Sequence, residues 1–159
     1  MSVYVPVGLT GLFNGLILPD LDIVMLGLGA HRYFMYHSAI GLAVLKRLYR
    51  IWSEKQKGGG SLQRAFRKVC GVALAGCAVG VGIHLVSDAL HPKTVIFPFF
   101  GSLISGTMVD DTLWLLGNAV WAFKIAADTF VLVLAEDEIS AREWLKCHNP
   151  FGNQFGTTA

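Results

Sequence analysis

Charged residues are scarce in this sequence, and cysteine is rarer still. Asp, Glu, Lys and Arg make up 15% of the 159 residues, whereas soluble domains carry about 25%. The three cysteines, Cys70, Cys77 and Cys147, have no CxxC or CxxH spacing, which argues against a disulfide framework or a thiolate metal site. Hydrophobic residues make up 53%, and the mean hydropathy is +0.53. This composition favours a helical membrane protein over a soluble protein with unusually apolar helices.

The apolar residues fall into four long segments, and the first lacks the basic residues and cleavage site of a signal peptide. A transmembrane helix needs about 20 residues, and basic side chains that reach the interface can extend a shorter one. We therefore predict an all-α, polytopic fold with about four transmembrane helices, at residues 3–19, 34–48, 67–90 and 112–135. The predicted transmembrane domain is 1–135, and 136–159 is a polar C-terminal tail. Between the last two spans, 92–109 is predicted to be an interfacial loop or half-helix.

Basic residues are concentrated in one segment, because eight of the thirteen Lys and Arg lie between Lys46 and Lys68. Such a run can bind nucleic acid, but apolar segments flank it on both sides. We therefore interpret it as a cytoplasmic loop between two spans, and we expect no nucleic-acid partner. Lys124, near the middle of the last span, could pair with Asp128 at i+4.

A cytoplasmic position for this loop brings the start of the second span and the end of the third to the opposite face of the membrane. Ten polar residues are then predicted at or near that face: Asp20, Asp22, His31, Arg32, His37, His84, Asp88, His91, Asp110 and Asp111. We interpret the last three as ordinary loop residues. The others form one predicted polar site.

The third span carries glycine and polar residues on one helical face. Gly80, which belongs to the GxxxG pair in GCAVG, lies at steps of four from His84 and Asp88. In the second span His37 and Gly41 have the same spacing. We predict that Gly41 packs against Gly80 and that His37 consequently lies near His84.

Imidazole and carboxylate groups together suit Zn, Mn, Fe or Ni. Six residues are candidate ligands: Asp20, Asp22, His31, His37, His84 and Asp88. One zinc ion usually takes about four ligands, so either two metals or one metal with outer hydrogen-bonding partners would account for six. Arg32 would orient a phosphate or carboxylate group. Asp22, or Asp20 in its place, would act as a further ligand or as a general base.

Each of these residues also has an interpretation without a metal. Asp20 could cap a helix after Pro19, and the polar pair at 31–32 could face lipid headgroups. His37 and His84 could hydrogen-bond across two helices, with Asp88 as the partner of His84. The metal hypothesis therefore depends on the group of residues and not on any one of them.

Four sequence elements occur in a fixed order: LPDLD at Leu18–Asp22, HRYFMYHS at His31–Ser38, HLVSD at His84–Asp88 and PF at Pro98–Phe99. In this order they resemble a family of membrane-bound, metal-dependent hydrolases whose bacterial members include LexA-regulated inner-membrane proteins. The resemblance covers residues 8–100. It implies a helical membrane protein with the six candidate ligands as its metal cluster, zinc being the first expectation. It also implies kinship with the zinc-dependent phospholipase C type of site, and hence phosphoester hydrolysis.

The spacing of the first two histidines departs from that family. His31 and His37 are separated by one residue more than is usual, and Tyr33 to Tyr36 stand where Gly and Thr are usual. If this segment were helical, one extra residue would rotate His37 by about 100°.

Two functions follow as hypotheses. The first is a metal-dependent hydrolase of phosphoesters or lipids in a bacterial inner membrane, with its site at the non-cytoplasmic face. The second is a non-catalytic subunit of a larger membrane complex, and a small metal or proton transporter is a third and weaker hypothesis. The expected partners are membrane lipid and either partner subunits or further copies of the chain.

Overall fold

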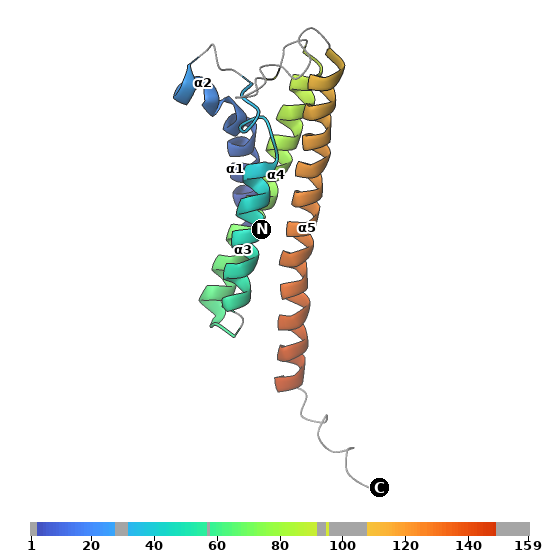
Figure 1. Ribbon diagram of the computed structural model, residues 1–159. Coiled ribbons are helices and arrows are strands. Elements are labelled where there is room, and N and C mark those ends of the chain that lie inside the picture. The colour runs from blue at the N-terminus through green and yellow to red at the C-terminus, as the bar shows by residue number, and fades with distance from the viewer. Residues whose placement is uncertain (1–2, 28–31, 57, 92–94, 96–107, 149–159) are drawn as a thin grey trace.

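The computed structural model describes residues 3–27, 32–56, 58–91, 95 and 108–148, and the side chains of 108–110 and 136–148 are not described. All regular elements in these ranges are helical (Figure 1). They are α1 (Tyr4–Ile17), η1 (Leu18–Asp20), α2 (Leu21–Leu26), α3 (Ile40–Lys55), α4 (Ser61–Ala89) and α5 (Met108–His148). The predicted all-helical fold is therefore confirmed for this part of the chain.

Three helical segments of the described chain are long and apolar enough to cross a membrane. They are Tyr4–Leu26, Ser61–Ala89 and Asp111–Ala135, which correspond to three of the predicted spans. The predicted fourth, at 34–48, is not confirmed: Phe34–Ser38 form turns and bends, and α3 begins only at Ile40. α3 has 16 residues, five of them charged, so it is short and polar for a span. The chain thus has the architecture of a helical membrane protein with three candidate spans.

Glycine allows α1 and α4 to pack backbone against backbone. A Cβ added at Gly15 would meet the Cys77 carbonyl, and one added at Gly80 would meet the Leu12 carbonyl, in both cases closer than real Cβ atoms come. The glycines of both helices therefore allow a closer approach than any larger residue would. The predicted contact of Gly41 with Gly80 is wrong, since Gly80 faces α1 and a Cβ at Gly41 would meet nothing within 4 Å.

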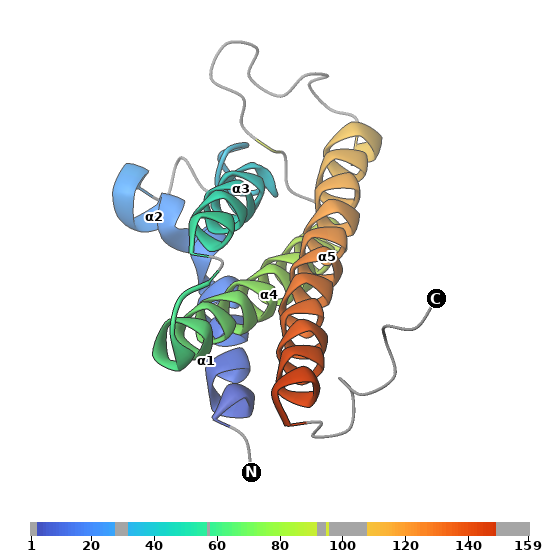
Figure 2. The same cartoon turned by 90° about the horizontal axis from the view of Figure 1, so that it is seen from below.

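Helix α4 lies between α1 and α5 and contacts both (Figure 2). Its small residues pack against α5, where a Cβ at Gly82 would meet the Phe123 ring. The buried core on these helices and α3 includes Leu42, Ala78, Val81, Leu85, Leu115, Ala119 and Ala122. Tyr49 ties α3 to α4 by donating a hydrogen bond of 3.2 Å to the Arg67 carbonyl. The core therefore holds α3 beside the longer helices.

Helix α5 continues through residue 135 without a break and ends at His148. The predicted border between the transmembrane domain and the tail therefore lies inside one helix. Within the span, Lys124 Nζ lies 3.1 Å from Asp128 Oδ2, which confirms the predicted i+4 pair. Lys46 of α3 joins the same carboxylate at 2.6 Å. The predicted loop or half-helix at 92–109 falls almost wholly outside the described residues.

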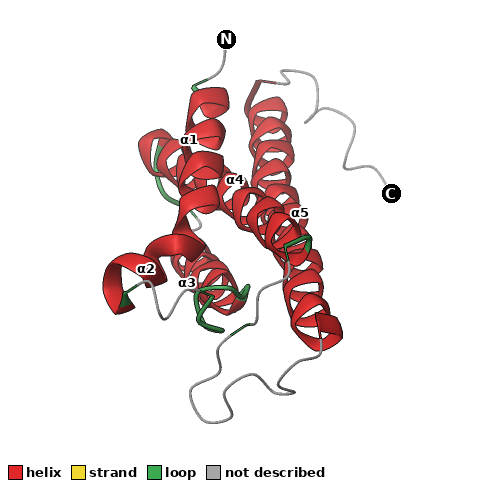
Figure 3. Cartoon of the chain, turned by 90° about the horizontal axis from the view of Figure 1, so that it is seen from above, coloured by secondary structure: helices red, strands yellow, loops and turns green. Residues whose placement is uncertain are grey.

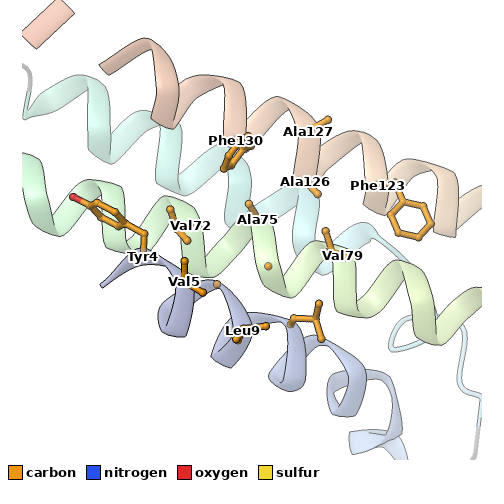
Figure 4. A pocket seen from close by; sticks show the side chains of 13 residues that line it. Tyr4, Val5, Leu9, Val72, Ala75, Val79, Phe123, Ala126, Ala127 and Phe130 are labelled. Carbon is orange, nitrogen blue, oxygen red and sulfur yellow. The ribbon is translucent and has the colours of Figure 1, made fainter. Parts of the chain in front are cut away.

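An apolar pocket of about 550 Å³ lies between α1, α4 and α5 (Figure 4). Its walls include Val5, Leu9, Ala75, Val79, Phe123 and Phe130. None of the residues that line it belongs to the predicted polar site, so this pocket and that site are separate features.

Candidate metal centre

Six polar side chains meet where α1, α4 and the connection before α3 come together. We call Asp20, Asp22, Arg32, His37, His84 and Asp88 the polar cluster. They come from η1, α2, the 32–39 connection and the end of α4 (Figures 1 and 3). Of the predicted site residues, only His31 lies outside the described part of the chain. The sequence-based prediction that these segments converge is thus matched by the structure for the other six.

The chain reaches this arrangement through local breaks in helical structure. Pro19 lacks a backbone N–H and stands in η1, where α1 has ended. Gly27, with φ of +88°, ends α2 in a conformation that favours glycine. Arg32 is the one described non-glycine residue with a positive φ, at +68°. These breaks turn the chain back so that the 32–39 connection passes the end of α4.

The 32–39 connection accommodates the extra residue between the histidines. The N–H groups of Tyr36 and His37 both donate to the Tyr33 carbonyl at 3.0 Å, which makes a tight turn and not a helix. The rotation expected for a helical segment therefore does not apply. His37 is fully buried, and its ring centroid lies 5.7 Å from that of His84. The predicted proximity of these two histidines is confirmed.

Both histidine rings present the same nitrogen to the cluster. His84 Nδ1 lies 2.7 Å from the Leu16 carbonyl oxygen, which can only accept, so this nitrogen carries the hydrogen. His37 Nδ1 lies 3.3 Å from Asp22 Oδ2, another acceptor. In the tautomer that carries its hydrogen on Nδ1, each ring has its lone pair on Nε2. Metal-binding histidines are oriented in this way by a carbonyl or carboxylate on their other nitrogen.

Asp88 joins the two Nε2 atoms. Its Oδ2 lies 3.1 Å from His37 Nε2 and 3.3 Å from His84 Nε2. Within the described chain, neither this oxygen nor His84 Nε2 makes a hydrogen bond, although both are buried. The other oxygen, Oδ1, accepts a hydrogen bond of 3.1 Å from Arg32. Asp88 is therefore fixed by Arg32 on one side and faces the histidines on the other.

Asp20 completes the cluster at its outer edge. Its Oδ1 lies 3.6 Å from His84 Nε2, and its side chain is 43% exposed. Ligand atoms of Asp20, His37 and His84 all lie within 4.8 Å of one another. Around a tetrahedral zinc with bonds of about 2.1 Å, neighbouring ligand atoms are about 3.4 Å apart. The distances of His84 Nε2 to Asp88 and Asp20, 3.3 and 3.6 Å, and of His37 Nε2 to Asp88, 3.1 Å, are close to that value.

Asp22 and Arg32, the two predicted catalytic residues, are buried. Asp22 is 0% exposed and its Oδ2 accepts a hydrogen bond of 2.9 Å from the Tyr33 N–H. Arg32 is 2% exposed and also donates to the His91 carbonyl at 3.0 Å. Their contacts fit positioning: Asp22 orients His37, and Arg32 orients Asp88. Direct catalytic roles for both remain predictions.

Two residues of α5 that were not predicted from the sequence support the site. Trp114 Nε1 donates to the His37 carbonyl at 3.1 Å, and Asn118 Oδ1 accepts from the Ala39 N–H at 3.0 Å. Both side chains carry hydrogen-bonding groups inside an apolar span, and they are four residues apart, so they lie on one face of the helix. This pattern could have identified them as candidate site residues. Asp110 and Asp111, interpreted as loop residues, instead lie in α5, and Asp111 is 4% exposed. The interpretation was wrong because α5 begins at Met108, before the predicted start of the span at residue 112.

The chain has no match among protein-family models, curated proteins or solved structures.

Proposed function

We propose that the chain is an integral membrane protein that holds a divalent metal ion, with zinc as the first expectation. His37, His84 and Asp88 would be its ligands, and Asp20 would be either a fourth ligand or the general base. The observation that carries this proposal is the common orientation of the two histidines, whose Nδ1 atoms face acceptors while their Nε2 atoms converge on Asp88. Hydrogen bonding between two histidines alone would not need this arrangement. Asp22 and Arg32 would hold the ligands in place.

Hydrolysis of a phosphoester or lipid-like substrate is the activity that this site supports best. When bound, a divalent ion supplies Lewis acidity and a water nucleophile near neutral pH. Asp20 is the most exposed member of the cluster, so it is placed to meet a substrate or to accept a proton. The buried Asp22 and Arg32 keep His37 and Asp88 in place. The family resemblance of the LPDLD, HRYFMYHS and HLVSD elements supports the same class of reaction.

Elemental analysis of the purified full chain tests the metal proposal. We expect about one zinc or similar ion per chain, since the cluster offers about the four ligands that one zinc takes. The double variant His37→Gln, His84→Gln should lose it. His91→Gln is the matched control, because this exposed histidine lies just beyond α4 and the hydrogen bond that its ring makes among the described residues is with the Ser87 carbonyl. A metal-free parent with an intact fold would contradict the proposal.

An Asp22→Asn variant separates positioning from ligation. The amide oxygen can still accept from Tyr33, but it carries no charge toward His37 Nδ1. Loss of such an outer partner typically weakens metal affinity about 10–100-fold. We therefore expect Asp22→Asn to bind zinc more weakly in a competition titration, whereas His84→Gln should abolish binding. Equal affinity of parent and Asp22→Asn would exclude the positioning role.

We further propose that this membrane is a bacterial inner membrane, with the turn between α3 and α4 in the cytoplasm. The basic residues between Lys46 and Lys68 support this orientation through the positive-inside rule. The polar cluster, at the other end of α4, would then face the non-cytoplasmic side. A reporter that is active only in the cytoplasm should be active when inserted between Gly58 and Gly60. Activity of a periplasm-specific reporter at that point would reverse the assignment.

A non-catalytic subunit of a larger membrane complex is the second candidate. Lys124 supports it, because its side chain is 69% exposed although it lies inside an apolar span. A charged side chain that points outward from a span costs free energy in contact with lipid. The cost is smaller where a polar residue of another subunit covers it. Metal content distinguishes the two candidates, since a subunit that serves only for packing needs no metal.

A further inference from the structure

A second pocket lies between α3 and α5, apart from the polar cluster. Its volume is about 380 Å³, and it is lined by Ala43, Lys46, Arg47, Arg50, Trp121 and Ile125. Three of these six are cations from one helix, whereas the two residues from α5 are apolar or aromatic. The pocket thus has a positively charged wall and an apolar wall.

The positive charge of this pocket is only partly balanced. Asp128 is shared by Lys46 and Lys124, at 2.6 and 3.1 Å. Arg50 lies 3.6 Å from Glu54, but both side chains are more than half exposed, and such pairs contribute little. Arg47 is exposed and makes no ion pair in the described part of the chain. An anion in the pocket would therefore meet an excess of cations.

The cations lie on the side of the pocket nearer to the turn between α3 and α4. Ala39 bonds to Asn118 and Lys46 to Asp128, so α3 and α5 run in the same direction in near register. By the nearer of these contacts, Arg50 is level with about residue 132, so it lies roughly 5 Å from the end of the α5 span at Ala135. Arginine side chains at such depths extend toward the membrane interface. Trp121, by contrast, lies near the middle of its span.

We infer that this pocket binds the headgroup phosphate of an anionic phospholipid from the leaflet on the side of the 56–60 turn. Arg47 and Arg50 would contact the phosphate, as guanidinium groups do with two parallel hydrogen bonds. An acyl chain would lie along Trp121 and Ile125. The cations lie nearer to the membrane surface and the apolar residues lie deeper, as do the headgroup and the acyl chains of a phospholipid in this leaflet. Basic pockets between membrane helices bind anionic headgroups in this way.

Native mass spectrometry of the full chain in detergent, titrated with lipid, tests this inference. The probes are phosphatidylglycerol and phosphatidylcholine with identical acyl chains, and inorganic phosphate as a competitor. We expect the parent to bind phosphatidylglycerol at least about tenfold more tightly than phosphatidylcholine. Both lipids carry a phosphate, but the choline ammonium would bring a positive charge against the cationic wall, and repulsion of one such charge is worth about that factor. Arg47→Gln with Arg50→Gln should remove this preference. Lys55→Gln, which removes an exposed cation of α3 outside the pocket, should keep it.

A conservative variant and a fold check complete the experiment. Arg47→Lys with Arg50→Lys keeps the charge but not the paired hydrogen bonds, so it should recover part of the preference. Circular dichroism should show parental helix content in all variants. Equal binding of the two lipids to the parent would overturn the inference, as would an unchanged preference in the double glutamine variant. Displacement of phosphatidylglycerol by millimolar phosphate would instead make this a site for free anions. If an acidic protein chain stays bound to the parent and to Lys55→Gln but not to the double glutamine variant, the pocket would instead be a protein interface.

Discussion

Replacement of Gly80 by alanine is expected to destabilise the protein by about 1–3 kcal/mol, the usual cost of overpacking a well-packed contact. The added methyl group would meet the Leu12 carbonyl, the Leu16 nitrogen and the Gly15 carbonyl carbon. These are backbone atoms, so no side-chain rotation can relieve the clash. The α1–α4 contact would have to open instead. Thermal unfolding in detergent measures the change.

Gly117→Ala is the matched control for this substitution. It lies in α5, and an added Cβ would meet nothing within 4 Å. Alanine favours helix by up to about 1 kcal/mol over glycine, so this variant should be as stable as the parent or slightly more stable. The two alanine variants should thus move the unfolding temperature in opposite directions. A Gly80→Ala protein as stable as Gly117→Ala would show that the helices do not pack this closely.

Removal of Asp88 should have a larger effect. An Asp88→Ala substitution takes away the carboxylate that Arg32 bonds at 3.1 Å and leaves a guanidinium that is 2% exposed. Breaking a buried ion pair by removing one partner costs about 3–5 kcal/mol. We expect a loss of this size by thermal or denaturant unfolding. A chelator in all samples keeps the comparison free of any metal contribution.

A double-mutant cycle assigns this loss to the pair. Arg32→Leu with Asp88→Ala removes both charges, and the pair can be replaced by apolar groups at little cost. The double variant should therefore be more stable than Asp88→Ala alone. Arg32 also donates a hydrogen bond to the His91 carbonyl. In the double variant this carbonyl can accept a hydrogen bond from water instead, because His91 is exposed. Strictly additive losses would mean that the pair contributes nothing to stability.

Hydropathy was enough to locate the three candidate spans, because each is a long apolar segment between polar ones. Their helices differ from the expected segments mostly at the ends, as with α4, which starts at Ser61. A span was predicted at 34–48 because the apolar residues of this segment extend beyond α3 into the turn before Ile40. That turn depends on the backbone of Arg32 and Tyr33, which no hydrophobic pattern encodes.

The residues of the polar cluster were easier to predict than the contacts between them. The prediction that both histidines lie at one face of the membrane agrees with their proximity, although the Gly41–Gly80 contact from which their pairing was argued does not form. Which helix meets Gly80 could not be read from spacing, because α1 also offers small residues at Gly11 and Gly15 and packs there instead of Gly41. The orientation of His37 by Asp22 depends on three-dimensional detail that their i+15 spacing does not indicate.

The polar cluster draws on two distant parts of the chain, residues 20–37 and residues 84–88. During synthesis the first part emerges well before the second, so the site stays incomplete until α4 has entered the membrane. The glycine contacts of α1 with α4 then bring His84 to the Leu16 carbonyl. Assembly of the polar cluster and pairing of these two helices are consequently the same event. If the cluster binds a metal as proposed, acquisition of the metal would report that α1 and α4 have paired.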